Sequence, residues 1–260
     1  MDEAFMEQRI KLAIVTGASS GVGAATASLL VKHGYRVVMI ARSADRLNAL
    51  AGSLGVLAIA APANAASETE MAPIATRLLA DYGAPDLIVN SAGAGRWERI
   101  EDTTEADARE MMDAPYMAAF VTTRVFLPAM LERGSGVILH VNSPACIAAW
   151  PTSVGYAAAR WALRGLHEAL AQDLAGTGVR SCNVLFGKIS SDYFDNNPGV
   201  EEKLPKMDRT IPTMTPEQCA EKLVMLADAP RHQAVFPFML SVNVLLARLF
   251  PGIARWLLRM

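Results

Sequence analysis

The chain has 260 residues and a formal net charge of −2, with 52% hydrophobic and 19% charged residues. This length and composition fit one large α/β domain with a well-covered interior and exclude extended disorder. The charge leaves no basic stripe for phosphates, so we expect no nucleic-acid partner.

Short apolar runs without strict alternation recur along the chain, which is typical of strands buried on both faces. They cover residues 11–16, 36–40, 56–60, 87–90, 136–142 and 179–186, with a seventh run at 234–238. Helix-length segments lie between them, for example 22–33, 70–82, 105–132 and 154–174. This order predicts one α/β domain over residues 1–260, a doubly wound Rossmann-type parallel sheet with helices on both faces. Ligands of such a sheet bind at the carboxyl ends of its strands.

A glycine-rich turn follows the first predicted strand and opens a helix: residues 16–23 read Thr-Gly-Ala-Ser-Ser-Gly-Val-Gly. Gly17 and Gly21 let the backbone turn tightly near a pyrophosphate, and Gly23 lets the helix pack close to the sheet. Free amides at the helix start then favour phosphate. The turn predicts a dinucleotide site that includes Ser19, Ser20 and Val22; a ligand-free connection is the alternative.

The spacing Thr-Gly-x-x-x-Gly-x-Gly resembles that of the short-chain dehydrogenase/reductase family. Further motifs follow in the family's order, namely Asn90-Ser91-Ala92-Gly93, Ser143, Tyr156 and Phe186-Gly187, so the resemblance covers about residues 11–191. It implies a doubly wound fold and NAD(P)-dependent oxidation or reduction of an alcohol/carbonyl pair. It also implies cofactor contacts at Asn64, Asn90, Ala92, Gly93, Gly187, Ile189 and Ser191.

The end of the second strand indicates which dinucleotide is bound. A carboxylate there would bind the adenosine ribose of NAD, but the sequence has Arg42. A guanidinium matches a 2′-phosphate in charge and in fork geometry, which favours NADP(H). An exposed arginine without a ligand is the alternative.

Three residues form the expected catalytic set. Helical spacing places Tyr156 and Arg160 one turn apart on one face, and Ser143 follows the preceding strand. By the resemblance, Tyr156 donates a proton to the substrate oxygen and Ser143 holds that oxygen by a hydrogen bond. A free phenol titrates at about pH 10, so proton transfer near neutrality requires a nearby positive charge. The family normally uses a lysine for this; here the cation is Arg160, the expected electrostatic partner and ribose clamp, which does not release a proton.

Two further positions depart from the family pattern. Pro115 stands where an asparagine usually completes the proton relay, and a proline within a helix predicts a kink. Phe186 replaces the usual proline before Gly187, and we expect it to loosen the turn beside the nicotinamide.

These departures leave three functions open. The first is an NADP(H)-dependent oxidoreductase that reduces a hydrophobic ketone or aldehyde. The second is a non-redox dehydratase, isomerase or cyclase that uses Ser143 and Tyr156. The third is a catalytically silent NADP(H)-binding protein.

Two C-terminal segments bear on the substrate. By the resemblance, residues 187–212 form a lid, and their aromatic and apolar content predicts a hydrophobic, lipid-like substrate. The apolar tail 236–260 is interrupted by Pro237 and Pro251, and its longest uncharged run is too short to span a bilayer. If Pro251 only bends or restarts the helix, Arg248, Arg255 and Arg259 share one face, which is typical of a helix lying on lipid. Packing on the body or on another subunit is the equal alternative.

The remaining residues bear on metal binding, on the substrate pocket and on where the protein is found. The histidines are scattered along the sequence and none has a ligand partner at metal spacing, so we expect no metal site. Trp150 and Tyr193 either line a substrate pocket or pack in the core. The three separated cysteines and the acidic start predict a cytoplasmic protein. We also expect a homodimer or homotetramer.

Overall fold

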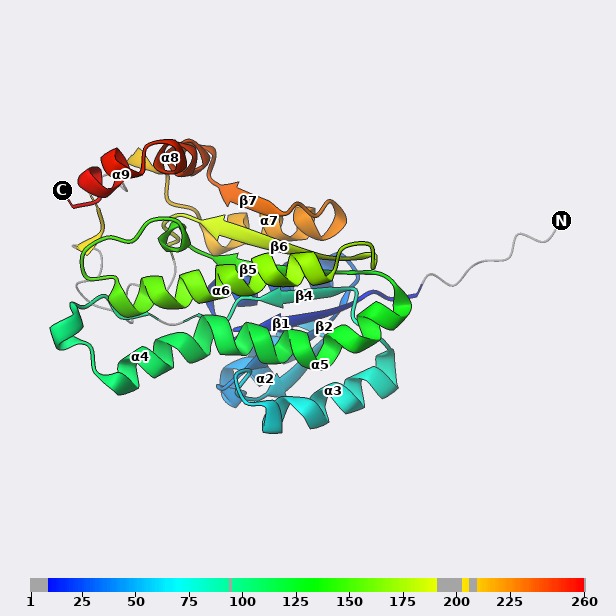
Figure 1. Cartoon of the computed structure of the whole chain (residues 1–260). Helices are drawn as coiled ribbons and strands as arrows, with labels where there is room; N and C mark the ends of the chain where they lie inside the picture. Colours follow the sequence, from blue (N-terminus) through cyan, green and yellow to red (C-terminus); the bar gives the residue numbers. More distant parts are fainter. Residues whose placement is uncertain (1–8, 94, 191–202, 206–209, 260) are drawn as a thin grey trace.

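The computed structural model describes residues 9–93, 95–190, 203–205 and 210–259 (Figure 1). Its centre is a seven-stranded parallel sheet in the order β3-β2-β1-β4-β5-β6-β7. The strands are β1 (Leu12–Thr16), β2 (Arg36–Ala41), β3 (Ala58–Pro62), β4 (Leu87–Asn90), β5 (Gly136–Asn142), β6 (Val179–Phe186) and β7 (Gln233–Phe236). The helices are α1 (Gly21–Lys32), α2 (Ala44–Leu54), α3 (Glu68–Tyr82), α4 (Glu105–Met112), α5 (Ala118–Arg133), α6 (Val154–Asp173), α7 (Pro216–Asp228), α8 (Phe238–Leu249) and α9 (Pro251–Leu257).

Helices cover both faces of this sheet because its central strands are apolar on both sides. One core cluster joins α1, α2 and α7 to the strands through residues such as Leu30, Leu47 and Leu223. A second cluster on the other face includes Leu78 of α3 and Phe126 of α5 (Figure 1). The predicted doubly wound Rossmann-type α/β fold is confirmed. The chain reverses its winding between β1 and β4, which is where such folds bind ligands.

The predicted elements differ from the observed ones mainly at prolines. The helix expected over 105–132 is divided by a π-helical turn at Asp113–Met117, in which Ala118 N–H donates to the carbonyl of Asp113. This wider turn stands where Pro115 predicted a kink, because proline offers no amide to the α-helical ladder. The last predicted strand ends at Phe236, before Pro237, and Pro251 begins α9 after a break at Phe250.

Within the described residues, the helical run over 105–133 is long and apolar enough to cross a membrane by length and composition. That run packs against α3, β4, β5 and α6, so its apolar side chains serve the core of the fold.

Candidate active site

A large cavity lies at the carboxyl ends of the central strands. Its volume is about 1420 Å³, above the roughly 300–1,000 Å³ of pockets for drug-sized ligands, so a dinucleotide and a second molecule fit together. Most of the sequence-predicted site residues line it: Gly17, Ser19, Ser20, Gly21, Val22, Arg42, Asn64, Ala92, Gly93, Ser143, Tyr156, Arg160, Gly187 and Ile189. Ser191 and most of the expected lid at 187–212 lie outside the described residues.

The glycine turn joins β1 to α1 and is tied to the loop after β4. Gly17 has φ +65°, and a Cβ there would lie 2.8 Å from the Cα of Ala92, so only glycine fits. Thr16 Oγ1 accepts hydrogen bonds from the N–H groups of Ser91 (3.1 Å) and Ala92 (3.3 Å). Gly23 has a role other than the expected one, because its absent Cβ makes room for the carbonyl oxygen of Gly17 rather than for the sheet.

The start of α1 suits an anion. The side chain of Ser20, its N-cap residue, makes no capping hydrogen bond, and the first turn contains no acidic residue. Amides in that turn therefore keep their positive potential for a ligand. The donor set fits the pyrophosphate of a dinucleotide.

Two arginines flank the cavity beyond the end of β2. Arg42 and Arg46 both line it, and Arg46 Nε donates to Ser43 Oγ at 3.1 Å. Sequence analysis missed Arg46, although its position four residues after Arg42 was visible. Asn64 also lines the cavity, and its Oδ1 accepts the Ala66 N–H at 3.1 Å, which leaves its amide N–H₂ for a ligand.

The side chain of Asn90 does not line the cavity, so its expected cofactor contact stays a prediction. This residue ends β4 with its side chain in the core, 3% exposed, where Nδ2 lies 3.3 Å from both Thr123 Oγ1 and His140 Nδ1. Its neighbour Ser91 lines the cavity instead. The side chains of successive residues in a strand point to opposite sides. The motif at residues 90–93 therefore does not show by itself which of its side chains faces the ligand.

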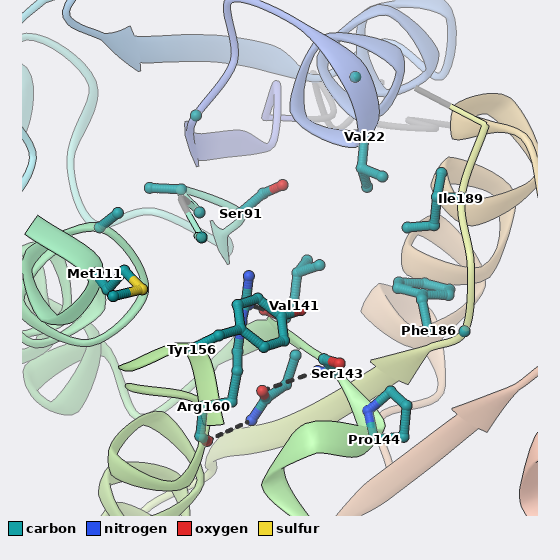
Figure 2. A pocket seen from close by; sticks show the side chains of 18 of the residues that line it. Val22, Ser91, Met111, Val141, Ser143, Pro144, Tyr156, Arg160, Phe186 and Ile189 are labelled. Carbon is teal, nitrogen blue, oxygen red and sulfur yellow. Dashed lines mark hydrogen bonds between the residues drawn. The ribbon is translucent and has the colours of Figure 1, made fainter. Parts of the chain in front are cut away.

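Ser143 and Tyr156 lie on two walls of the cavity and are 9% and 8% exposed. Ser143 follows β5, where its Oγ accepts the Ala145 N–H at 3.3 Å and its own N–H donates to Asn142 Oδ1 at 2.9 Å (Figure 2). Tyr156 lies in the first turn of α6. The two hydroxyl groups are not hydrogen-bonded to each other in the described chain, so both have bonding capacity for a substrate oxygen.

Arg160 extends into the cavity beside Tyr156, one turn further along α6 (Figure 2). Its Cζ is 5.0 Å from the centroid of the Tyr156 ring, and its Nη1 donates to the carbonyl of Val141 at 3.2 Å. It is 8% exposed, and its Nε has no partner among the described residues. An unpaired buried guanidinium donor costs free energy, which favours a ligand hydroxyl there.

An aromatic wall surrounds the Tyr156 ring. Trp97 lies with its ring centroid 5.6 Å from that of Tyr156, and Trp150 lies 4.9 Å from Trp97. Both tryptophans line the cavity and also pack with buried Met111, so both interpretations of Trp150 apply. Tyr193 lies outside the described residues.

The expectation that Phe186 loosens its turn is wrong. Phe186 is the last residue of β6, 2% exposed, and its ring stacks on Phe236 with centroids 5.9 Å apart. The next amide, Gly187 N–H, donates to the Phe236 carbonyl at 3.0 Å, so the ladder continues into the turn. Ile189 then reaches the cavity, as does Lys188, which sequence analysis missed.

Comparison with known proteins settles the family. The family model described as short chain dehydrogenase matches residues 11–200. The chain belongs to the short-chain dehydrogenase family. It is 30% identical over 226 residues to the NADP-dependent 3-hydroxy acid dehydrogenase of Salmonella typhi, covering 85% of this chain and 90% of that protein.

Solved short-chain dehydrogenase structures agree with this assignment. A short-chain dehydrogenase from Streptomyces avermitilis superposes with a TM-score of 0.82 at 26% identity, covering 94% of each chain. The alcohol dehydrogenase of Thermococcus sibiricus, complexed with 5-hydroxy-NADP, gives a TM-score of 0.76 at 26% identity, covering 87% of this chain and 96% of that one. The chain is therefore an oxidoreductase of the short-chain dehydrogenase family with a nucleotide-binding Rossmann fold.

Pro115 has no direct place in the cavity of this short-chain dehydrogenase. It is buried, and the π-helical turn presents Asp113 and Ala114 to the cavity instead. Asp113 is exposed, so water has access to this part of the wall.

Three of the four histidines, although scattered along the sequence, come together in the fold. The rings of His140 and His167 have centroids 6.0 Å apart, and those of His167 and His232 lie 4.6 Å apart. Ligand atoms of His167, Glu168 and His232 lie within 4.8 Å of one another. Arg164, 3.4 Å from the Glu168 carboxylate, adds a positive charge that opposes a cation. The absence of a metal site stays a prediction.

Proposed function

We propose that this short-chain dehydrogenase is an NADP(H)-dependent reductase of a hydrophobic ketone or aldehyde. One observation carries the proposal: Ser143 and Tyr156 line the same cavity as the glycine turn and Arg42. The cavity wall between them is rich in apolar side chains, including Trp97, which suits an apolar substrate.

NADP(H) is preferred in this proposal because of charge. Arg42 and Arg46 offer two guanidinium groups at the end of β2, where a 2′-phosphate would lie, and no carboxylate lines that part of the cavity among the described residues. The names of the Salmonella typhi relative and of the Thermococcus sibiricus complex both include NADP, which supports the same choice.

The cofactor supplies a hydride to the substrate carbonyl carbon when it is bound. The protein residues hold and protonate the oxygen. Ser143 Oγ donates a hydrogen bond to it, and the Tyr156 phenol gives it a proton as negative charge develops. The Arg160 guanidinium offsets the charge left on the phenolate, and its free Nε suits a ribose hydroxyl. The aromatic wall and the Phe186 stack exclude water from the reacting carbon.

The proposal is tested by measuring NADPH consumption with a panel of hydrophobic ketones and aldehydes. We expect Tyr156→Phe to lower kcat by about 100-fold or more, with the Kd for NADPH unchanged in a fluorescence titration. Tyr116→Phe is the matched control, because Tyr116 lies on the π-helical turn and does not line the cavity. Wild-type turnover by Tyr156→Phe would refute the assigned role.

A second candidate is non-redox acid/base chemistry by Ser143 and Tyr156. It is favoured by Pro115, which stands in the π-helical turn where the family usually has the asparagine of the proton relay. Product formed without net NADPH consumption would identify it. NADPH binding without turnover of any carbonyl in the panel would indicate a silent cofactor-binding protein.

A further inference from the structure

The two C-terminal helices, α8 and α9, carry a set of exposed apolar side chains. They lie at the outer end of the sheet beyond β7, with the C-terminus beside them (Figure 1). We define the apolar face as six side chains of α8, of α9 and of the junction residue Phe250 that are between 48% and 62% exposed: Leu245, Leu246, Leu249, Phe250, Ile253 and Trp256. A helix on the surface of a soluble protein normally presents polar residues there.

The fold itself does not use this face. The opposite side of α8 packs on the body through Leu240 and Val244, which are 3% and 6% exposed and cluster with Cys146 and Leu185. Ala254, 9% exposed, is buried on the inner side of α9. The helices are therefore anchored without the six exposed side chains, three of which (Leu246, Phe250 and Ile253) also line the cavity.

The charge around the face points to an anionic partner. Residues 229–260 contain four arginines and no aspartate or glutamate, in a chain whose net charge is −2. Arg248, Arg255 and Arg259 are exposed on α8, on α9 and just after α9. A twofold pairing of two copies would bring both sets of arginines to one interface, with no acidic residue on either helix pair to neutralise them.

The lengths of α8 and α9 decide whether they could span a membrane or only lie on its surface. At about 1.5 Å per residue, helices of 12 and 7 residues are about 18 Å and 10 Å long, well below the roughly 30 Å hydrocarbon core of a bilayer. Pro251 restarts the helix, so the two helices form separate short segments. Exposed Trp256 and Phe250 with flanking arginines suit the headgroup region.

The same helices form a wall of the cavity. Leu246, Phe250 and Ile253 are about half exposed at the surface, yet they line the cavity that contains Ser143 and Tyr156. A molecule dissolved in lipid at this face would reach the catalytic hydroxyls along an apolar surface.

We infer that α8 and α9 dock on the surface of an anionic lipid bilayer and open the active-site cavity toward it, so that the substrate is drawn from the lipid phase. The substrate part of this inference depends on the proposed reductase function. The docking part depends only on the exposed apolar and basic side chains.

Flotation with lipid vesicles tests the docking, using phosphatidylcholine alone and phosphatidylcholine with phosphatidylglycerol. We expect the wild type to float with the anionic vesicles and to be released by high salt. Leu249→Glu/Trp256→Glu should lower the partition coefficient by about 100-fold. These two residues do not line the cavity, so NADPH oxidation with a water-soluble carbonyl should not change.

Two controls separate the outcomes. Met225→Glu replaces an exposed apolar residue of α7, 44% exposed, and should float like the wild type. Arg255→Gln, which keeps the apolar face, should lower flotation with anionic vesicles by about fivefold. Equal flotation of wild type and both C-terminal variants would overturn the docking. The docking would also be overturned if the wild type did not bind vesicles and light scattering showed that Leu249→Glu/Trp256→Glu dissociates an oligomer. Tyr156→Phe should still float, so failure of the reductase proposal is distinguishable from failure of docking.

Discussion

Gly23 and Gly165 are both glycines within α-helices, but alanine should have opposite effects at the two positions. A helical Gly→Ala change stabilises by about 0.5–1 kcal/mol when the added methyl group has room. At Gly165 on α6, no heavy atom of the described residues lies within 4 Å of the new Cβ, apart from its chain neighbours and the backbone of its own helix. At Gly23 on α1 the Cβ would lie 2.3 Å from the carbonyl oxygen of Gly17 and 2.7 Å from its carbon.

The clash at Gly23 is with backbone, which cannot rotate away as a side chain does. Relieving it requires a shift of about 1 Å between the start of α1 and the Gly17 turn. Overpacking of this kind costs about 1–3 kcal/mol, which exceeds the helix gain and leaves a net loss of about 1–2 kcal/mol. Because Gly17 is also fixed against Ala92, the displacement falls on the amides that would hold the pyrophosphate.

Thermal unfolding and an NADPH fluorescence titration measure both effects. For a domain of this size we expect the Tm of Gly23→Ala to fall by about 2–8 °C and that of Gly165→Ala to rise by about 1–4 °C. The Kd for NADPH should rise at least about tenfold in Gly23→Ala, equivalent to about 1.4 kcal/mol, and stay constant in Gly165→Ala. A Gly23→Ala protein with wild-type Tm and Kd would refute the reasoning.

Three other predictions test the charges of the site and of the core. Arg42→Ala should raise the KM for NADPH by about tenfold or more and leave the KM for NADH within about twofold of the wild-type value. The control is Arg77→Ala, because Arg77 is exposed on α3. Equal effects of Arg42→Ala on both cofactors would contradict the 2′-phosphate assignment. Arg160→Lys should keep carbonyl reduction, whereas Arg160→Met should lose about 100-fold in kcat; full activity of the methionine variant would show that the cation is not needed. Burial lowers the pKa of His140 to about 3 and that of His167 to about 4, so the unfolded chain binds more protons below pH 6.5. The free energy of unfolding should therefore fall as the pH drops from about 6.5 toward those values; urea midpoints that do not change between pH 7 and pH 4.5 would contradict this.

The strands could be predicted from sequence because a parallel sheet with helices on both faces requires continuous apolar runs. β4, β5 and β6 match their predicted ranges for this reason. The third strand was predicted at 56–60 and lies at Ala58–Pro62, since its ends are set by pairing with β2, where Val37 faces Ala58 and Ala41 faces Pro62. The register of a strand depends on both paired segments, so it cannot be predicted from the sequence of one strand alone.

The candidate site could be predicted where a motif fixes the backbone and not where side-chain direction decides. The glycine turn, Ser143 and Tyr156 lie where the spacing placed them. The direction of the Asn90 side chain depends on the side of β4 from which it projects, and the histidine cluster depends on three elements meeting. His140 and His232 are 92 positions apart, and both lie beside His167 of α6, which packs on β5 and β6.

The position of Arg160 bears on whether the altered catalytic set still works as a unit. Its guanidinium lies over the Tyr156 ring on α6 and donates to the Val141 carbonyl on β5, and it passes close to Gly93 after β4, where an added Cβ would lie 3.0 Å from Nη2. A side chain held by two parts of the fold is pre-organised, so its charge beside the phenol needs little rearrangement during the reaction. The absence of a side chain at Gly93 gives the planar head the space that a slimmer lysine would not need. In the proposed mechanism arginine therefore keeps the electrostatic part of the lysine's role, while the proton-relay part, which arginine cannot perform, must come from another group.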